Sequence, residues 1–306
     1  MSGIFGVVSK DDCARDLLYG TDYHSHLGTE YGGMAVLGEN FTRQIHNISH
    51  TQFKSKFYED SRHMPGRMGI GAISASDEQP IYLNSRLGPF CLVTNGLIEN
   101  TEDLAAELLK RGVSFSEVSR NAVNSTELVA KIIAEGLNFV DGIEKVFASI
   151  KGSCSLMVLT KDGIYAARDR FGYTPLVVGK RKDAWAVTSE TCAFPNSDFE
   201  IVKYLGPGEI VLIDDAGISA KRAGEDSGQI CAFLWIYKGF PASSYEGVNA
   251  EIVRERCGRA LARRDKDIEV DVVSGVPDSG VGHAIGYAME SRKPYRRPLE
   301  IGRAHV

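Results

Sequence analysis

The chain has 306 residues, of which 43% are hydrophobic and 25% are charged, so it is long enough for two globular domains. Its net charge of −5 and pI near 5.9 argue against general attraction to nucleic acid or anionic membranes, and no apolar run reaches the roughly 18 residues of a membrane span. Six cysteines lie far apart without a C-x-x-C pair, which is typical of reduced, mostly buried thiols.

The N-terminal sequence MSGIFGVVSK starts with an apolar run that is too short to be an export signal. No basic residue precedes this run, and Lys10 and Asp11 end it. We therefore expect a cytoplasmic protein. The small side chain of Ser2 favours removal of Met1, which would leave a free amine beside the Ser2 hydroxyl as a candidate base and nucleophile.

Short apolar runs separated by glycine-containing turns predict strands in the first two thirds of the chain and indicate large antiparallel sheets. The expected strands are 4–8, 33–37, 68–73, 90–94, 155–159, 164–168, 175–178, 185–188 and 209–213. Amphipathic patterns predict helices between them, with Asn100 as the N-cap of the second helix. The expected helices are 12–19, 101–111, 126–135 and 138–150.

A polar segment at 220–229 is the best candidate for a domain boundary. After it, apolar residues predict a helix around 252–261, and VDVVSGV at 270–276 predicts a buried strand followed by PDSG and a further helix. A strand, a glycine-containing turn and a helix in this order form the βα unit of a parallel sheet, where the helix N-terminus binds anions. An ordinary turn capped by Asp278 or Ser279 fits the spacing equally well.

Five segments in this order resemble a class II glutamine amidotransferase domain. They are GIFGVV after the small residue Ser2, TNG at 94–96, YAARDRFGYTPLVVGK at 165–180, VTSE at 187–190 and YLGPGE at 204–209. CAFLWIYKGFPASSYEGVN at 231–249 and VSGVPDSGVGHAIGYAMES at 273–291 narrow the resemblance to the amidophosphoribosyltransferases. The resemblance covers almost the whole chain.

The resemblance implies an α+β protein with an Ntn-hydrolase αββα sandwich at 2–230, followed at 231–299 by the start of a Rossmann-like α/β phosphoribosyltransferase domain. In this family the first domain hydrolyses glutamine, and the ammonia displaces pyrophosphate from phosphoribosyl pyrophosphate in the second, giving phosphoribosylamine for purine biosynthesis. Mg²⁺ is expected to neutralise the leaving group. The resemblance also implies a homo-oligomer. It places Cys231 where some members bind an iron–sulfur cluster, although a buried thiol is favoured here.

Most residues that act on glutamine in this family are replaced here. Ser2 stands at the position of the cysteine nucleophile, and an alkoxide, unlike a thiolate, must be generated by a base. Leu27 and Ser74 stand where the family has arginines, the second of which would pair with the α-carboxylate of glutamine. Ser125 stands where an aspartate would receive the α-ammonium group. Without these partners, we expect free glutamine to bind poorly.

Asn95 and Gly96 remain, the pair whose side-chain amide and backbone N–H form the family's oxyanion hole. Three interpretations of the first domain are open: a degenerate glutaminase kept as scaffold, a serine-nucleophile amidohydrolase for another amide, and a working glutaminase. The replaced residues favour the first. A non-catalytic scaffold or regulatory module is the alternative for the whole chain, whereas GVPDSG favours retained transferase chemistry with ammonia, glutamine or another amine as donor.

In the second domain the resemblance implies that Asp278, Ser279 and Gly280 form a pyrophosphate-contacting turn. The family's ribose-phosphate motif, an apolar stretch with two acids and a Ser/Thr-Gly loop, does not follow it. EIGRAHV at 300–306 resembles a translated sequencing adaptor. We therefore expect a truncated second domain, a non-native tail, and weak anion binding without turnover.

His24 and His26 are spaced so that both imidazoles could hold a metal ion on one side of a strand. The neighbouring sequence offers no cysteine or carboxylate as a further ligand. We therefore expect hydrogen-bonded or solvent-facing histidines and no metal ligands in this chain.

Overall fold

The computed structural model describes residues 2–119, 122–226 and 228–299; Met1 and the expected tail at 300–306 lie outside the described residues. The chain divides into two compact units, Met1–Ile230 and Cys231–Val306. We call them unit 1 and unit 2. Among the described residues no helix is both long and apolar enough to cross a membrane.

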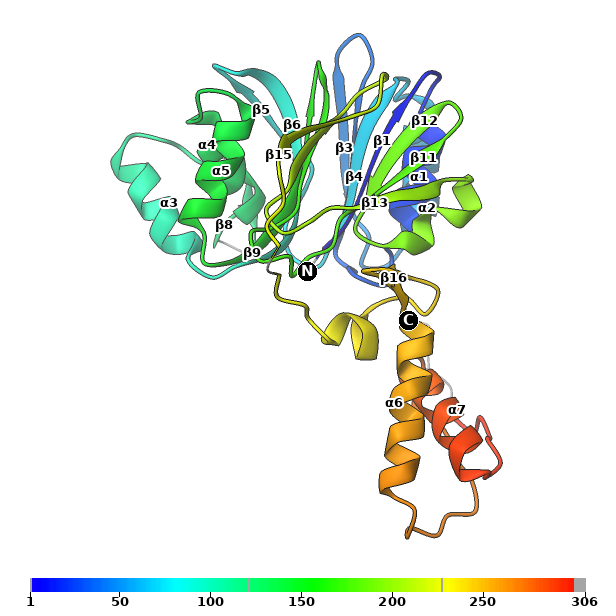
Figure 1. Ribbon diagram of the computed structural model, residues 1–306. Coiled ribbons are helices and arrows are strands. Elements are labelled where there is room, and N and C mark those ends of the chain that lie inside the picture. The colour runs from blue at the N-terminus through cyan, green and yellow to red at the C-terminus, as the bar shows by residue number, and fades with distance from the viewer. Residues whose placement is uncertain (1, 120–121, 227, 300–306) are drawn as a thin grey trace. The chain divides into compact units, whose positions relative to one another are not determined.

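Unit 1 contains two antiparallel sheets that pack face to face (Figure 1). In spatial order the seven-stranded sheet consists of β13 (Glu200–Tyr204), β11 (Val177–Arg181), β12 (Ala184–Thr188), β1 (Ser2–Ser9), β4 (Met68–Ser74), β2 (Tyr31–Leu37) and β3 (Phe41–Asn47). The six-stranded sheet consists of β15 (Ile218–Arg222), β14 (Ile210–Ile213), β10 (Gly163–Ala167), β9 (Gly152–Thr160), β6 (Gly88–Ile98) and β5 (Ile81–Ser85).

Helices cover the outer faces of both sheets (Figure 1). The seven-stranded sheet packs against α1 (Ala14–Asp22) and α2 (Phe53–Arg62), and the six-stranded sheet packs against α3 (Thr101–Lys110), α4 (Ser125–Ala134) and α5 (Phe139–Ser149). A short ribbon of β7 (Val118–Ser119) and β8 (Ala122–Val123) precedes α4. The expected αββα sandwich is therefore confirmed.

The central strand β1 shows why its sequence is continuously apolar. Every residue of β1 is buried. Phe5 and Val7 belong to the core beneath α1 and α2, whereas Ile4 and Val8 belong to the core between the two sheets. A strand that is covered on both faces needs apolar side chains at even and odd positions. A strand in which apolar and polar residues alternate would cover only one face.

The strands and helices expected in unit 1 are present, with shifted ends. The expected strand 90–94 is part of the longer β6, and 175–178 is displaced towards β11. Asn100 occupies the expected N-cap position of α3, but its side chain makes no capping hydrogen bond to this helix. Instead, Asn100 Nδ2 donates to the carbonyl of Ser149 at 3.0 Å, and Oδ1 accepts from the N–H of Lys151 at 2.7 Å. Asn100 therefore ties the start of α3 to the end of α5.

Unit 2 is built on α6 (Ala250–Arg264) and α7 (Gly280–Ser291), which cross closely at glycines. A Cβ atom at Gly258 would lie 1.9 Å from the carbonyl oxygen of His283, and one at Gly286 would lie 2.0 Å from that of Glu255. Glycine is thus required at both positions. A π-helical turn (Leu234–Lys238) and a ribbon of β16 (Ser244–Tyr245) and β17 (Val248–Asn249) precede α6.

The buried strand expected at 270–276 is wrong. Val273 forms only a single parallel bridge with Tyr295, and no strand of the described part of unit 2 includes it. Val272 and Val276 are 47% and 68% exposed. A parallel strand is stable when neighbours cover it on both faces, and within residues 228–299 the segment at Tyr295 is the single pairing partner.

Candidate functional site

Ser2 lies at the start of β1 and is held by residues from both sheets of unit 1. It pairs with Ser74 of β4, and only 8% of its surface is exposed. Its backbone N–H donates a hydrogen bond of 3.1 Å to Oδ1 of Asn95 in β6. The packing of the two sheets thus brings Ser2 to Asn95, although 93 positions separate them in the sequence.

The Ser2 hydroxyl has hydrogen-bond partners, but none of those described is a base. Its Oγ donates to Oγ of Ser74 at 3.3 Å and accepts from Nε2 of Gln79 at 3.0 Å. Gln79 is fixed in turn by the N–H of Thr94, which donates to its Oε1 at 2.8 Å. Because a neutral hydroxyl needs a base to become a nucleophile, the base would have to be a free amine at Ser2 itself. No pattern in the sequence indicates the role of Gln79.

Gly96 follows Asn95 in β6 and lies directly against β9. A Cβ atom at position 96 would come within 2.0 Å of the carbonyl oxygen of Ser153, so the fold itself requires glycine here. Asn95 is 5% exposed and stands opposite Ser155 in the β6–β9 ladder. The structure therefore brings Ser2, Asn95 and Gly96 to one place, with Oδ1 of Asn95 occupied by the Ser2 N–H.

A pocket of about 100 Å³ opens beside Ser2, which we call the Ser2 pocket. Its walls come from β1, β6, β9, the loop after β4 and the start of α4, and they include Ser2, Asp77, Thr94, Gly96, Ser125 and Ser153. None of the described lining residues is a lysine, arginine or histidine. Among these described residues, the carboxylate of an amino acid would therefore meet no cationic side chain.

The positions that carry charged residues in the resembling family have local roles here. Oγ of Ser74 accepts a hydrogen bond of 3.1 Å from the N–H of Asp77, and the hydroxyl of Ser125 donates to the Asp77 carboxylate. Leu27 lies in the turn after α1, where its N–H donates to the carbonyl of His24, and it does not line the Ser2 pocket. The structure brings Ser74 and Ser125 to the site but not Leu27.

His24 and His26 make different contacts rather than forming a shared ligand set. His24 is fully buried, donates through Nδ1 to the carbonyl of Gly20 at 2.9 Å, and places Nε2 3.0 Å from Oγ1 of Thr188. Burial lowers the pKa of His24 to about 4, so the ring is neutral near pH 7. His26 Nε2 lies 3.0 Å from a carboxylate oxygen of buried Glu190.

The turn that leads into α7 is stabilised by its backbone. The N–H of Gly280 donates to the carbonyl of Val276 at 3.0 Å, and the N–H of Val281 donates to that of Asp278 at 3.2 Å. Ser279 occupies the N-cap position, but its side chain makes no capping hydrogen bond. The exposed Asp278 side chain has no partner among the described residues either. A side-chain cap from Asp278 or Ser279 therefore does not explain this turn.

Gly280 is not required by the packing of unit 2. A Cβ atom there would lie 3.7 Å from the nearest atom, Cβ of Val276, which is ordinary van der Waals contact. By contrast, a Cβ atom at Gly275 would come within 2.8 Å of the Gly280 carbonyl. Glycine at 280 therefore leaves the outer surface of the turn uncovered, whereas glycine at 275 is needed because a side chain there would clash with the backbone of the turn.

The cysteines do not form a metal centre in the part of the chain that the structure describes. All six are free, and four are buried, as expected for a mostly buried set, but the burial expected at Cys231 is wrong because this residue is partly exposed. Burial raises the pKa of Cys91 to about 12. Cys231 has no cluster of histidine, cysteine or carboxylate ligands around it among the described residues. Iron–sulfur clusters are held by several thiolates, so the described residues do not fit one.

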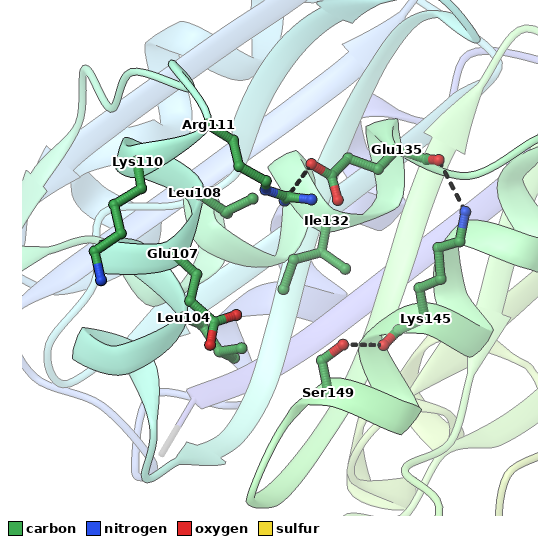
Figure 2. Close-up of a pocket in the computed structure, with 9 residues that line it drawn as sticks. All are labelled: Leu104, Glu107, Leu108, Lys110, Arg111, Ile132, Glu135, Lys145 and Ser149. Carbon is green, nitrogen blue, oxygen red and sulfur yellow. Dashed lines mark hydrogen bonds and ion pairs between the residues drawn. The ribbon is translucent and has the colours of Figure 1, made fainter.

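A larger pocket of about 440 Å³ lies between α3, α4 and α5 (Figure 2). Leu104, Leu108 and Ile132 supply its apolar surface. Two of its cationic side chains already contact Glu135: Arg111 pairs with the Glu135 carboxylate, and Lys145 donates to the Glu135 carbonyl at 2.9 Å (Figure 2). This pocket shares no residue with the Ser2 pocket.

Comparisons with known proteins agree with this geometry. Residues 66–196 match a family described as a glutamine amidotransferase domain. The chain is 31% identical over 308 residues to an amidophosphoribosyltransferase of Archaeoglobus fulgidus, covering 96% of this chain and 66% of that protein. It is 29% identical over 327 residues to that of Methanocaldococcus jannaschii, covering 98% of this chain and 68% of the relative.

A solved structure matches almost the whole chain. The glutamine phosphoribosylpyrophosphate amidotransferase from Bacillus subtilis, complexed with ADP and GMP, superposes with a TM-score of 0.89 at 28% identity. The match covers 99% of this chain and 67% of that chain. The chain thus spans about two thirds of the length of the relatives that it matches.

Proposed function

The chain belongs to the amidophosphoribosyltransferase family, and from this premise we propose that it serves amino transfer to phosphoribosyl pyrophosphate in purine biosynthesis, in the cytoplasm. The observation that carries the proposal is the turn before α7. There, the side chains of Asp278 and Ser279 have no partner among the described residues, and Gly280 leaves the outer surface open. Because these two side chains make no hydrogen bond to the described protein, they are available to contact a ligand.

The reaction requires the turn to stabilise a leaving diphosphate. The nitrogen lone pair of ammonia attacks C1 of the ribose, the bond from C1 to the diphosphate oxygen breaks, and pyrophosphate leaves with that electron pair. Ser279 can donate its hydroxyl proton to a phosphoryl oxygen. Mg²⁺ enters such sites through substrate phosphates and one or two carboxylates, and Asp278 is an exposed carboxylate of this turn. When bound, the ion neutralises charge on the leaving group.

For unit 1 we propose that glutamine is no longer hydrolysed at a useful rate, so ammonia reaches unit 2 from another source. Two features support this. The described partners of the Ser2 hydroxyl are Ser74 and Gln79, neither of which is a base. The described lining of the Ser2 pocket also supplies no cationic side chain for the α-carboxylate of glutamine. Desolvating an unpaired carboxylate costs several kcal/mol, on the order of the whole binding energy of a small polar ligand.

Calorimetric titration with pyrophosphate, with and without Mg²⁺, tests the transferase proposal. We expect saturable heat that is weakened by Asp278→Asn and by Gly280→Ala. The Gly280→Ala variant is informative because the added Cβ fits unit 2 without displacing an atom, so reduced binding reports ligand approach. Asp267→Asn is the matched control, because it removes the same charge from another exposed position of unit 2. Equal heats from all four proteins would contradict the proposal.

A further inference from the structure

Among the described residues that line the Ser2 pocket, Asp77 has the one charged side chain. Asp77 is half-buried in the loop between β4 and β5. Its carboxylate accepts a hydrogen bond from the hydroxyl of Ser125 and has no cationic partner among the described residues. A partly desolvated carboxylate with a neutral partner leaves most of its acceptor capacity unused.

Capping of α4 does not account for Asp77. The N-cap of α4 is Asn124, which is fully buried and accepts from the N–H groups of Thr126 and Glu127 at 2.9 and 3.1 Å. Nδ2 of Asn124 also donates to the carbonyl of Glu78 at 2.9 Å, which ties the loop of Asp77 to the helix. The loop is therefore fixed without the Asp77 carboxylate, which is hydrogen-bonded to Ser125 in the lining of the pocket.

The rest of the pocket lining favours a cation that donates hydrogen bonds. Ser2, Thr94, Ser125 and Ser153 line the pocket, and each carries a hydroxyl oxygen, which can accept a hydrogen bond. The described lining supplies no positive side chain that would attract an anion. The volume of about 100 Å³ suits a group the size of a few water molecules rather than a long side chain.

We propose that the Ser2 pocket binds a small primary ammonium ion through Asp77, with the surrounding hydroxyls as further acceptors. The ammonium group donates up to three hydrogen bonds, one or more to the carboxylate and the others to hydroxyl oxygens. A zwitterionic amino acid is disfavoured, because its own carboxylate would lie near Asp77 without a counter-cation. This inference rests on the proposed loss of glutamine hydrolysis in unit 1, and it does not depend on phosphoribosyl chemistry in unit 2.

The test follows the backbone amide signals of Gly96 and Ser125 by NMR while the protein is titrated with methylammonium chloride. Sodium chloride at equal ionic strength and tetramethylammonium chloride, which cannot donate hydrogen bonds, are run in parallel. We expect saturable shifts with methylammonium alone. Asp77→Asn should weaken binding by about tenfold or more, since hydrogen bonds to charged groups are the stronger class. Asp162→Asn removes an exposed charge outside the pocket and should leave the affinity unchanged.

A second variant covers the case in which Asp77→Asn folds poorly. Ser76→Lys places an ammonium group on the pocket wall beside Asp77, and it should abolish methylammonium binding by occupying the carboxylate internally. Equal titration of Asp77→Asn and the parental protein would overturn the inference, as would shifts that sodium chloride reproduces. Ammonium chloride in place of methylammonium shows whether the free ion or only an alkylamine is accepted. Pyrophosphate titration of the same samples separates failure of this site from failure of the proposed transferase role.

Discussion

At the scale of single residues, the buried surroundings of Ser2 and His24 determine the hydrogen-bond partners of the Ser2 hydroxyl and the protonation state of the His24 ring. The described partners of the Ser2 hydroxyl contain no base, although the neighbouring Asn95 and Gly96 have the arrangement that the sequence led us to look for. His24, which the sequence left open as a hydrogen-bonded or exposed side chain, is fully buried between α1 and β12. Its neutral ring fills the space above Gly3, where a Cβ atom would lie 2.3 Å from Cβ of His24.

His24 should make unit 1 sensitive to mild acid. The pKa of His24 is about 4 in the folded protein and about 6.5 when unfolded, so the unfolded state binds the proton first. The resulting stability is fully present above pH 6.5 and is lost as the pH falls towards 4. Between pH 7.5 and pH 5 the expected loss is about 2 kcal/mol.

Urea unfolding at the two pH values, with the parental protein and His24→Gln, measures this contribution. The parental protein should lose about 2 kcal/mol more than the variant on acidification. His50→Gln, at an exposed position, serves as the control and should behave like the parental protein. If His24→Gln loses as much stability as the parental protein, the buried imidazole is not the group that titrates.

At the scale of elements, the face of α6 that is buried is not the face that its apolar residues mark. Ile252 and Leu261 are 48% and 38% exposed, whereas Arg254 and Gly258 are buried. Arg254 donates to the carbonyls of Trp235, Tyr237 and Gly239 at 2.6–3.1 Å, and so holds the π-helical turn against α6. Periodicity identified the helix but not its buried face, because a backbone-capping arginine and a close-packing glycine carry no apolar signal.

Arg254→Ala should destabilise unit 2 by roughly 3 kcal/mol or more, since three carbonyls, two of them in buried hydrogen bonds, lose their donor. Arg256→Ala, an exposed arginine on the same helix, is the control and should change the stability by less than about 0.5 kcal/mol. Hydrogen exchange of the α6 amides measures the stability of unit 2 independently of unit 1. Unchanged protection in Arg254→Ala would show that the turn does not depend on this side chain.

In unit 1 the hydrophobic pattern of the sequence predicted some strands and missed others. Strands buried on both faces, such as β1 and β9, have continuous apolar runs and were predicted. The strands β3 and β13, which the sequence analysis missed, are mostly polar or exposed at the ends of the seven-stranded sheet, where one side has no neighbour. Asp77 and Gln79 were missed because their roles depend on contacts with β1, β6 and α4 that lie far away in the sequence.

At the scale of the whole molecule, unit 2 leaves large apolar side chains in solvent. Among the described residues Tyr237, Val276 and Met289 are 60%, 68% and 55% exposed. Monomeric proteins rarely leave such groups gathered in one small unit. We propose that copies of the chain associate through unit 2, and we expect size-exclusion chromatography at micromolar concentration to show an oligomer. A stable monomer under these conditions would contradict this proposal.

For the molecule as a whole, we propose that unit 1 has retained the amidotransferase sandwich and has lost glutamine hydrolysis. The most direct test measures glutamate released from glutamine by the parental protein and by Ser2→Cys, with intact mass spectrometry to establish whether Met1 is removed. We expect both proteins to remain near the rate without protein, because a thiolate does not supply a cation for the α-carboxylate, and the described pocket lining contains none. Rapid glutamate release by either protein would show that the Ser2 pocket binds glutamine and would contradict the account.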